Sequence, residues 1–337
     1  ARYEMTENYR SCPPIVTLSN AFAATIQNRM KSDPIEAIRS DSGTVRITHH
    51  TGKNMEEAVV QELLATRGAA QCCVLTNTND EALRLLGLLL QNGVRAKLIQ
   101  SLGGFRLYNL AEIRFFLKKI DQSLKSPVIS NDLWNAAKKQ LFAAFAGSTC
   151  LEICGNLIQD FETTNPTKYR TDLEEFIRES NYEDFYRDDC ETVYVSTIHK
   201  AKGREFDNVY MMLAGNTAST EERRKLYVGM TRAKNALYIH CDTDLFSPYS
   251  LPGIEHTEDA RQYDEPKSLT LQLTHRDVVL DFFKDKKEIL LKLRSGMALS
   301  VEHDYLLAEL NGRTVRIAKL SKACRERLDR LRSNGYT

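Results

Sequence analysis

The chain has 337 residues, of which 42% are hydrophobic and 27% are charged. This length predicts about two domains with an ordinary apolar core. We expect neither a membrane nor a secreted protein, because no apolar run approaches the roughly 18 residues of a spanning helix and no signal peptide is apparent. The 46 basic and 45 acidic side chains nearly cancel, at a net charge of +1. That balance excludes electrostatic capture of nucleic acid by the whole molecule but leaves room for a local basic groove.

The eight cysteines are too dispersed for a disulfide scaffold. Cys150 and Cys154 lie four residues apart in a helical pattern, as small buried side chains on one helix face do. No two Cys-x-x-Cys pairs occur, so we expect no structural zinc site. This cysteine usage fits the reducing cytoplasm.

Short apolar strands alternate with amphipathic helices between residues 43 and 125. The expected strands are 44–48, 71–76 and 94–99. Three capping-box pairs mark the expected helix starts, Asn54 with Glu57, Thr78 with Glu81 and Asn109 with Glu112. Gly93 suits the left-handed position that ends the second helix. This alternation predicts right-handed crossovers and a parallel sheet.

Residues 126–188 change character, with helical patterns and no convincing strand. The expected helices there are 133–145, 151–161 and 172–178. The α/β rhythm then resumes with strands at 193–196, 209–213 and 237–240 and a charged helix from Glu221. A helical block inside an α/β pattern is most simply an insertion between two strands of one sheet.

Residues 247–268 are rich in Pro, Gly, Asp and Glu, which predicts a linker. Residues 269–337 read as a small basic α+β module carrying 14 basic and 9 acidic side chains. We expect a helix over 275–293, a hairpin turn at Asn311-Gly312 and a basic helix over 322–332. Whether that helix contacts DNA or a partner, or is only a solvated face, is left open.

Glu7-Asn-Tyr-Arg-Ser11 places an aromatic ring beside an arginine. The ring of Tyr9 can stack on a base, and the guanidinium of Arg10 offers a planar fork to phosphate oxygens. Taken alone, a Tyr-Arg pair is more often a surface packing pair.

The stretch from Val195 to Phe206 follows one apolar strand and precedes another. A loop at the carboxyl end of a parallel strand is where α/β sheets bind ligands. Lys200, Lys202 and Arg204 supply charge for phosphates, Gly203 allows close backbone approach, and Glu205 can accept from sugar hydroxyls. The alternative is a solvated loop with a charge run.

The stretch from Glu221 to Lys234 has glutamates in its first helical turn and bases later, which matches the helix dipole. Its alternative is an amphipathic helix with merely solvated charges. Arg232 lies beyond the apolar residues 227–230, where packing would hold it and let it reach a neighbouring domain.

Together and in this order, the three stretches resemble the superfamily 1 DNA helicases of the UvrD/Rep/PcrA group. Residues 8–11 resemble helicase motif IV, 197–206 motif V and 221–234 motif VI. Val74 to Asn79, Gly103-Gly104-Phe105 and Glu112-Ile113 resemble the part that precedes the inserted subdomain of this family. The likeness covers about residues 3–242 and does not extend to the tail.

The resemblance implies an α/β fold, a RecA-like (P-loop NTPase-type) parallel sheet lobe with a helical insertion and a small C-terminal module. The implied parts are a second RecA-like lobe (1–125 and 189–246), a shortened 2B-like insertion (126–188), a linker (247–268) and a basic module (269–337). At about 60 residues, the insertion is much shorter than the family's usual one, which casts doubt on a duplex-contacting role.

The resemblance also implies site roles, residue by residue. Tyr9 would stack on adenine, Gly203 would lie beside the nucleotide and Glu205 would bind the ribose. Arg10 and Arg232 would contact the γ-phosphate of ATP, Arg232 as an arginine finger. Thr197, His199 and Lys202 would face single-stranded DNA. We therefore expect Arg10 and Arg232 to converge on one cleft edge, near the loop around His199.

The chain has no Gly-x-x-x-x-Gly-Lys-Ser/Thr and no Asp-Glu pair at a strand end. The resemblance places these groups, with the Mg²⁺ ligands, on a first lobe, so we expect a piece of a longer polypeptide that is inactive alone. The implied whole is an ATP-dependent helicase that moves 3′ to 5′ on single-stranded DNA and unwinds duplex DNA.

Two other functions are alternatives to a helicase. The first is a non-catalytic nucleic-acid-binding or scaffolding module derived from a helicase lobe. The second is a nuclease-linked recombination protein, for which the tail offers no clustered Asp, Glu and Lys. The pathway served, for example DNA repair or recombination, the choice between DNA and RNA, and the oligomeric state are left open by the sequence.

Overall fold

The computed structural model describes residues 6–28, 33–99, 106–124, 126–185, 191–215, 219–266, 268–333 and 335–336. Gly103, Gly104, Phe105 and Cys190 therefore lie outside the described residues. The chain forms two compact units, one of residues 1–100 and 188–271 and one of residues 101–187 and 272–337. Within the described ranges, no helix is both long and apolar enough to cross a membrane.

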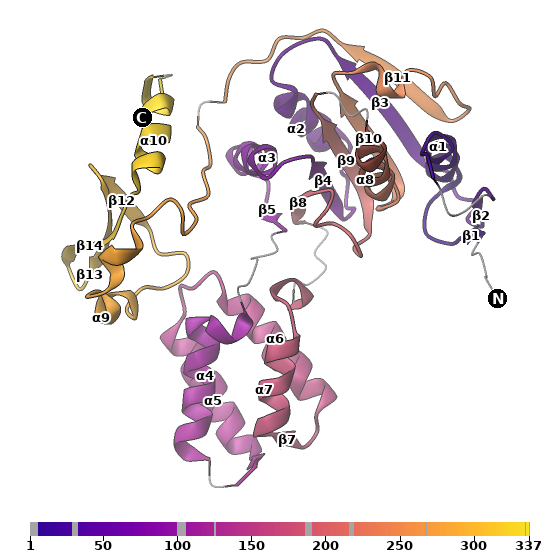
Figure 1. Cartoon of the computed structure of the whole chain (residues 1–337). Helices are drawn as coiled ribbons and strands as arrows, with labels where there is room; N and C mark the ends of the chain where they lie inside the picture. Colours follow the sequence, from indigo (N-terminus) through magenta and orange to yellow (C-terminus); the bar gives the residue numbers. More distant parts are fainter. Residues whose placement is uncertain are drawn as a thin grey trace. The chain divides into compact units, whose positions relative to one another are not determined.

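Unit 1 is built on a seven-stranded, fully parallel sheet with the strand order β11-β3-β10-β9-β4-β8-β5 (Figure 1). Its strands are β3 (Thr44–His50), β4 (Cys72–Thr76), β5 (Ala96–Leu98), β8 (Val193–Thr197), β9 (Phe206–Leu213), β10 (Ala233–Cys241) and β11 (Ile254–Asp259). The central strands β4 and β8 are buried along their whole length, as a sheet covered on both faces requires. The predicted α/β class with a parallel sheet is confirmed.

Helices cover both faces of this sheet, and each face has its own apolar core. The helices α1 (Pro13–Ala23) and α8 (Thr220–Met230) contribute to one core, and α2 (Met55–Thr66) and α3 (Asn79–Gln91) contribute to the other (Figure 1). A two-residue parallel pair, β1 (Glu7–Asn8) with β2 (Glu36–Ala37), stands apart from the main sheet. The short turn η3 (Asp244–Phe246) follows β10.

The predicted helix starts were right for Thr78 and wrong in detail for the other two. Thr78 and Glu81 form the complete capping box. Asn54 instead has a left-handed backbone, with φ of 59°, and its side chain donates to the carbonyl of Tyr263 over 2.8 Å. Asn109 belongs to a short turn, η1 (Leu107–Asn109), ahead of α4 (Ala111–Ser123). Gly93 has the expected positive φ, 71°.

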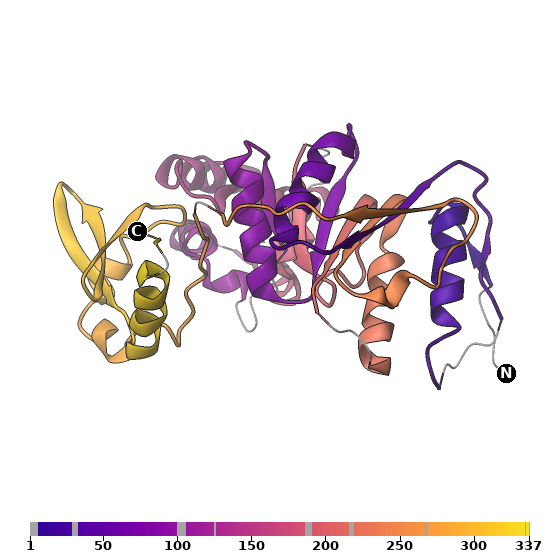
Figure 2. The same cartoon turned by 90° about the horizontal axis from the view of Figure 1, so that it is seen from above.

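The prediction of a linker over 247–268 was wrong for its middle part. Residues 254–259 form β11, which pairs in parallel with β3 from Val45 to His50 and forms one edge of the sheet (Figure 2). The pairing partner lies about two hundred positions earlier in the sequence, and Pro252 and Gly253 only mark the turn before the strand. Local composition therefore identified the turn but not the strand.

Unit 2 contains a helical block with its own core around the buried Trp134. Its helices are α4, α5 (Asn131–Ala144), α6 (Leu151–Thr164) and α7 (Arg170–Glu179), with the turn η2 (Tyr182–Phe185). Because α4 packs into this core, the block begins before the expected boundary at residue 126. Two residues of β6 (Val128–Ile129) pair antiparallel with β7 (Lys168–Tyr169), strands that the sequence pattern did not predict.

The C-terminal part of unit 2 has an antiparallel sheet of β12 (Leu299–Glu302), β13 (Tyr305–Leu310) and β14 (Arg313–Lys319). The predicted hairpin turn is confirmed, with Asn311 and Gly312 at positive φ. The predicted helix over 275–293 was wrong: only η4 (Leu280–Phe283) and α9 (Lys287–Leu290) form. Apolar side chains there serve tertiary contacts instead, as when the Phe282 ring packs on Tyr305.

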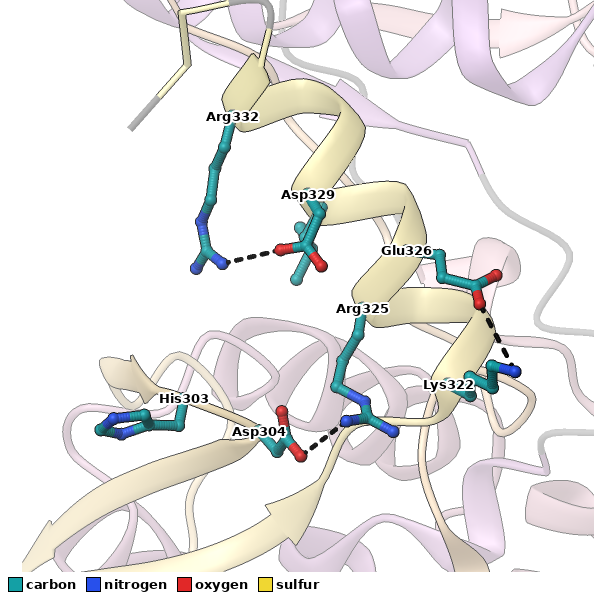
Figure 3. A pocket seen from close by; sticks show the side chains of 8 residues that line it. His303, Asp304, Lys322, Arg325, Glu326, Asp329 and Arg332 are labelled. Atoms are coloured by element: carbon teal, nitrogen blue, oxygen red, sulfur yellow. Dashed lines mark hydrogen bonds and ion pairs between the residues drawn. The ribbon is translucent and has the colours of Figure 1, made fainter.

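The predicted basic helix is α10 (Lys322–Ser333). Several of its cations are paired with nearby carboxylates around a shallow pocket (Figure 3). Arg325 donates to Asp304 over 2.8 Å, and Arg332 lies 3.2 Å from Asp329. This pairing leaves the helix less positive than its sequence suggests.

Candidate functional site

The loop that carries Tyr9 and Arg10 is fastened to the beginning of β10. The Asn8 side-chain oxygen accepts from the backbone N–H groups of Arg10 and Ser11, over 2.9 and 2.8 Å. The Ser11 hydroxyl donates to the Ala233 carbonyl over 2.7 Å, and the Cys12 N–H donates to the Lys234 carbonyl over 2.9 Å. Segments more than two hundred residues apart in the sequence are thereby joined.

Arg10 and Arg232 converge at this junction. The Arg10 guanidinium forms an ion pair with Glu205 and lies 3.4 Å from the Thr231 carbonyl. Arg232 donates to the carbonyls of Val228 and Arg204 over 3.0 and 3.1 Å, which holds it at the end of α8. Burial, followed by the charge of Arg10, lowers the pKa of Arg232. The two guanidinium groups therefore repel each other across a partly dehydrated site.

More cations than carboxylates gather here. We call this set the arginine cluster: Arg10, Arg39, Arg232 and Lys234 with the carboxylates Asp41 and Glu205. Lys234 Nζ lies 4.0 Å from Glu205, which already pairs with Arg10. Asp207 also acts electrostatically on Arg39, and four cations against these three carboxylates still leave an excess of positive charge, which an anionic ligand would neutralise.

The remaining predicted nucleotide residues are close in sequence to members of this cluster, Tyr9 to Arg10 and Gly203 to Glu205. Tyr9 directly precedes Arg10, its ring is 67% exposed, and its hydroxyl donates to Glu7 over 2.5 Å. Gly203 has φ of 90°, and a Cβ added there would meet no atom within 4 Å. A side chain is therefore excluded at Gly203 by backbone conformation and not by crowding.

Thr197, His199 and Lys202 lie along the segment between β8 and β9. Thr197 ends β8 and is buried, beside Thr76 at the end of β4. The side chains of His199 and Lys202 are exposed. The predicted DNA-facing residues therefore start at the carboxyl edge of the sheet.

The expectation that the two arginines lie around His199 was wrong in its location. The segment runs from Thr197, at the carboxyl end of β8, to Phe206, which pairs with Ala233 at the amino end of β10. Arg10 and Arg232 meet the Glu205 end of this segment. The arginine cluster therefore lies at the amino ends of the parallel strands. His199 comes just after the carboxyl end of β8, at the opposite side of the sheet.

Sequence reasoning assigned no individual role to Asn77, Asn79 and Lys225, which contact one another or Lys200 near this carboxyl edge. Lys200 Nζ donates to the side chain of Asn79 over 2.9 Å, and Lys225 Nζ donates to the carbonyl of Asn77 over 3.2 Å. Asn77 and Asn79 flank the capping residue Thr78, so their position at a strand-to-helix turn was the available signal.

A second polar group that the sequence did not reveal lies between β3, β10, β11 and α2. We call it the histidine network: His50, His240, Glu62, Asp259 and Arg46. The two imidazoles are buried, and His50 Nε2 lies 2.9 Å from His240 Nδ1. His240 Nε2 lies 2.8 Å from Glu62, and Arg46 also binds Glu62 over 2.7 Å. Burial, followed by the charge of His240, lowers the pKa of His50 to about 4.

In the part of the chain that the structure describes, no group of three or more His, Cys, Asp or Glu side chains is arranged to hold a metal ion. The described cysteines are free, most of them buried, and burial raises the pKa of Cys72 and Cys241 to about 11.

Relatives of known description share parts of this chain. It is 33% identical over 101 residues to the RecBCD enzyme subunit RecB of Chlamydia pneumoniae, covering 27% of this chain and 9% of that protein. It is 39% identical over 72 residues to YjcD of Bacillus subtilis (strain 168), covering 16% of this chain and 10% of that protein. The matches thus span about a tenth of each relative's length.

A solved structure, the C-terminal domain of a possible DNA helicase from Lactobacillus plantarum WCFS1, aligns over 74% of this chain and 99% of its own, with 14% identity and a TM-score of 0.39. The family model described as the UvrD-like helicase C-terminal domain matches residues 3–126 and 150–243. These ranges contain the arginine cluster and the segment between β8 and β9. The chain belongs to the UvrD-like helicase C-terminal domain family.

Proposed function

We propose that this chain is the C-terminal motor lobe of an ATP-dependent DNA helicase. In this proposal ATP binds between the lobe and a first RecA-like lobe of the same polypeptide. Hydrolysis drives 3′ to 5′ translocation along single-stranded DNA and unwinding of duplex DNA. The observation that carries the proposal is the convergence of Arg10, on Glu205, and Arg232, on the adjacent Arg204 carbonyl, in a chain of this family.

The arginine cluster is suited to the phosphates of ATP. Arg10 and Arg232 are held by backbone and carboxylate contacts while repelling each other, so a polyanion would relieve their repulsion. Arg232 would act as an arginine finger, stabilising the charge that develops at the γ-phosphate in the transition state. Arg10 would bind the same phosphate before and during the reaction.

The neighbouring residues would bind the rest of the nucleotide. The exposed ring of Tyr9 is free to stack on adenine. Glu205 would exchange its contact with Arg10 for the ribose hydroxyls, and the absence of a side chain at Gly203 would let the nucleotide approach the backbone. Binding would therefore separate Arg10 from Glu205 and present the guanidinium to phosphate.

Single-stranded DNA would bind the carboxyl edge of the sheet through Thr197, His199 and Lys202. The segment of residues 198–205 connects this edge to the arginine cluster, since it leaves β8 at one edge and enters β9 at the other. A shift of Glu205 when nucleotide binds would be transmitted along the segment to His199, six positions earlier. Such a connection could bias the lobe between two DNA-bound states.

The Mg²⁺ that accompanies ATP would be held by the first lobe, which would also supply the phosphate-binding loop. The chain alone should therefore hydrolyse no ATP, and joining it to the upstream lobe of its own gene should restore DNA-stimulated hydrolysis.

The test is the Arg232→Ala variant of that joined protein. Loss of an arginine finger should lower kcat by about 10³-fold or more. Affinity for single-stranded DNA should stay unchanged, because Arg232 lies at the opposite edge of the sheet from His199. The matched control is Arg224→Ala, which removes an exposed arginine of α8 whose guanidinium donates to the Gln27 carbonyl over 3.0 Å.

Near-normal turnover by Arg232→Ala would remove that arginine from its assigned role. Absence of hydrolysis in the unsubstituted joined protein, with DNA binding retained, would instead favour a non-catalytic nucleic-acid-binding or scaffolding module.

A further inference from the structure

Arg39 lies outside all three motif stretches but contacts two of them. It stands in the short connection between β2 and β3, and its side chain is 26% exposed. Its Nη1 donates to the Arg10 carbonyl over 2.6 Å and lies 3.4 Å from the Lys234 carbonyl. Its Nη2 donates to the Asn235 side chain over 2.8 Å. One guanidinium thus bridges the loop of Arg10 and the strand that follows Arg232.

Asp41 fixes the orientation of this guanidinium. Arg39 Nε donates to Asp41 over 2.8 Å, and Nη2 pairs with the second oxygen of the same carboxylate. The hydrogen bonds that Arg39 donates to Asp41 raise the pKa of Arg39 and lower the pKa of Asp41. A carboxylate that binds both Nε and Nη2 fixes the plane of the Arg39 guanidinium. The remaining N–H groups of Arg39 are then directed at the Arg10 and Lys234 carbonyls and the Asn235 side chain.

We infer that Arg39 is a positioning residue that keeps the Arg10 side chain next to that of Arg232. This inference rests on the proposed function. The backbone N–H of Arg10 is fixed by Asn8, and its carbonyl is fixed by Arg39. Both backbone polar groups of Arg10 are therefore held by side chains. Arg39 itself needs no contact with nucleotide, because it acts through the backbone of its neighbour.

The geometry favours arginine over lysine at this position. A guanidinium has five N–H donors in one plane, and here they serve the carbonyls of residues 10 and 234, the Asn235 amide and Asp41. An ammonium group on a similar stem could reach one or two of these acceptors but not all of them. A misplacement of about 1 Å in a reacting group can lower turnover by about 10²-fold.

The first arm of the test needs no ATP. Hydrogen exchange of the backbone N–H groups of residues 10–12 is measured in this chain, as the unsubstituted protein and as Arg39→Ala. Loss of a charged hydrogen bond should speed exchange in this loop by about tenfold. The control is Arg46→Ala, which removes a guanidinium that binds two carboxylates of the same unit, Glu62 and Glu255.

The second arm measures hydrolysis in the chain joined to its upstream lobe. Arg39→Ala should lower kcat more than it raises KM, Arg39→Lys should recover part of the loss, and Arg46→Ala should keep normal turnover. In the double variant Arg10→Ala with Arg39→Ala, the second substitution should add no loss, because Arg39 acts only through Arg10.

Unchanged exchange of residues 10–12 in Arg39→Ala, or an additive loss in the double variant, would overturn the inference. If Arg10→Ala lowers turnover and Arg39→Ala does not, the inference fails while the proposed function stands. If the unsubstituted joined protein hydrolyses no ATP, the proposed function fails, and the exchange arm alone confirms or overturns the contact.

Discussion

The arginine cluster and the histidine network are both polar groups on the same parallel sheet, yet their electrostatics differ. In the histidine network, Arg46 contacts Glu62 and Glu255, and His240 contacts the second oxygen of Glu62. In the arginine cluster, Arg10 and Lys234 share one carboxylate, Glu205, while Arg232 donates to main-chain carbonyls. The network pairs its guanidinium with two carboxylates, whereas the cluster has more cations than carboxylates, an excess that fits an anionic ligand.

This difference separates a structural role from a binding role. A buried network whose members pair with one another holds elements together, in this case β3, β10, β11 and α2. Like charges held close together in a half-buried site cost stability and are kept where function needs them. The comparison therefore assigns stability to one region and ligand binding to the other.

The largest stability effect should come from the Glu62→Ala variant. Glu62 is 13% exposed and binds both Arg46 and His240, so its loss leaves the buried Nε2 of His240 without this partner and leaves Arg46 with Glu255 alone. The free energy of unfolding should fall by about 3 kcal/mol. Glu205→Ala should change it by less than about 1 kcal/mol, since Glu205 and Arg10 are each about one-third exposed, at 34% and 35%.

Urea titration of both variants measures this contrast. Equal losses of stability would erase the distinction between the two regions.

Acid should destabilise the histidine network by a comparable amount. His50 has a pKa of about 4 in the folded chain against an ordinary value of 6.5. Between these two values the unfolded chain holds a proton at His50 that the folded chain does not. The free energy of unfolding should therefore fall as the pH decreases through this window, by up to about 1.4 kcal/mol per pH unit from this group.

Unfolding midpoints between pH 7 and pH 4 check this prediction, with His50→Gln as the comparison. The substitution should flatten the pH dependence. An unchanged slope would show that another group is responsible.

The smallest expected effect concerns DNA at the carboxyl edge. Lys202→Ala should weaken binding of single-stranded DNA and reduce the slope of log affinity against log salt by about 0.7, the value for one phosphate contact. Arg95→Ala is the control. This exposed arginine pairs with Glu191 and directly precedes β5, so it lies at the amino ends of the strands and not at their carboxyl ends. A salt titration with a fluorescently labelled oligonucleotide measures the slope for the unsubstituted protein and both variants. Equal slopes for all three would show that Lys202 does not contact DNA.

Sequence reasoning succeeded where structure is specified locally. The capping box of Thr78 and Glu81 and the left-handed Gly93 each depend on residues within one turn. The strands β4 and β8 were found because buried parallel strands are continuous apolar runs. It failed at β11, whose identity as a strand depends on distant β3.

The same limit applies to the site. The motif residues Arg10, Glu205 and Arg232 were predicted from their resemblance to a family, and their approach to one another could be expected only on that basis. Arg39 belongs to no motif and reaches Arg10 only in three dimensions. His50 and His240 are 190 positions apart and read individually as ordinary strand residues.

The central claim is that the arginine cluster stabilises charge that develops on a nucleotide phosphate. The most direct measurement is the affinity of the joined protein for ADP with aluminium fluoride, compared with ADP alone, for the unsubstituted protein and Arg232→Ala. We predict that the substitution weakens binding of the transition-state mimic by about 10²-fold or more while changing ADP affinity by less than about threefold. An equal change in both affinities, or no change in either, would contradict the claim.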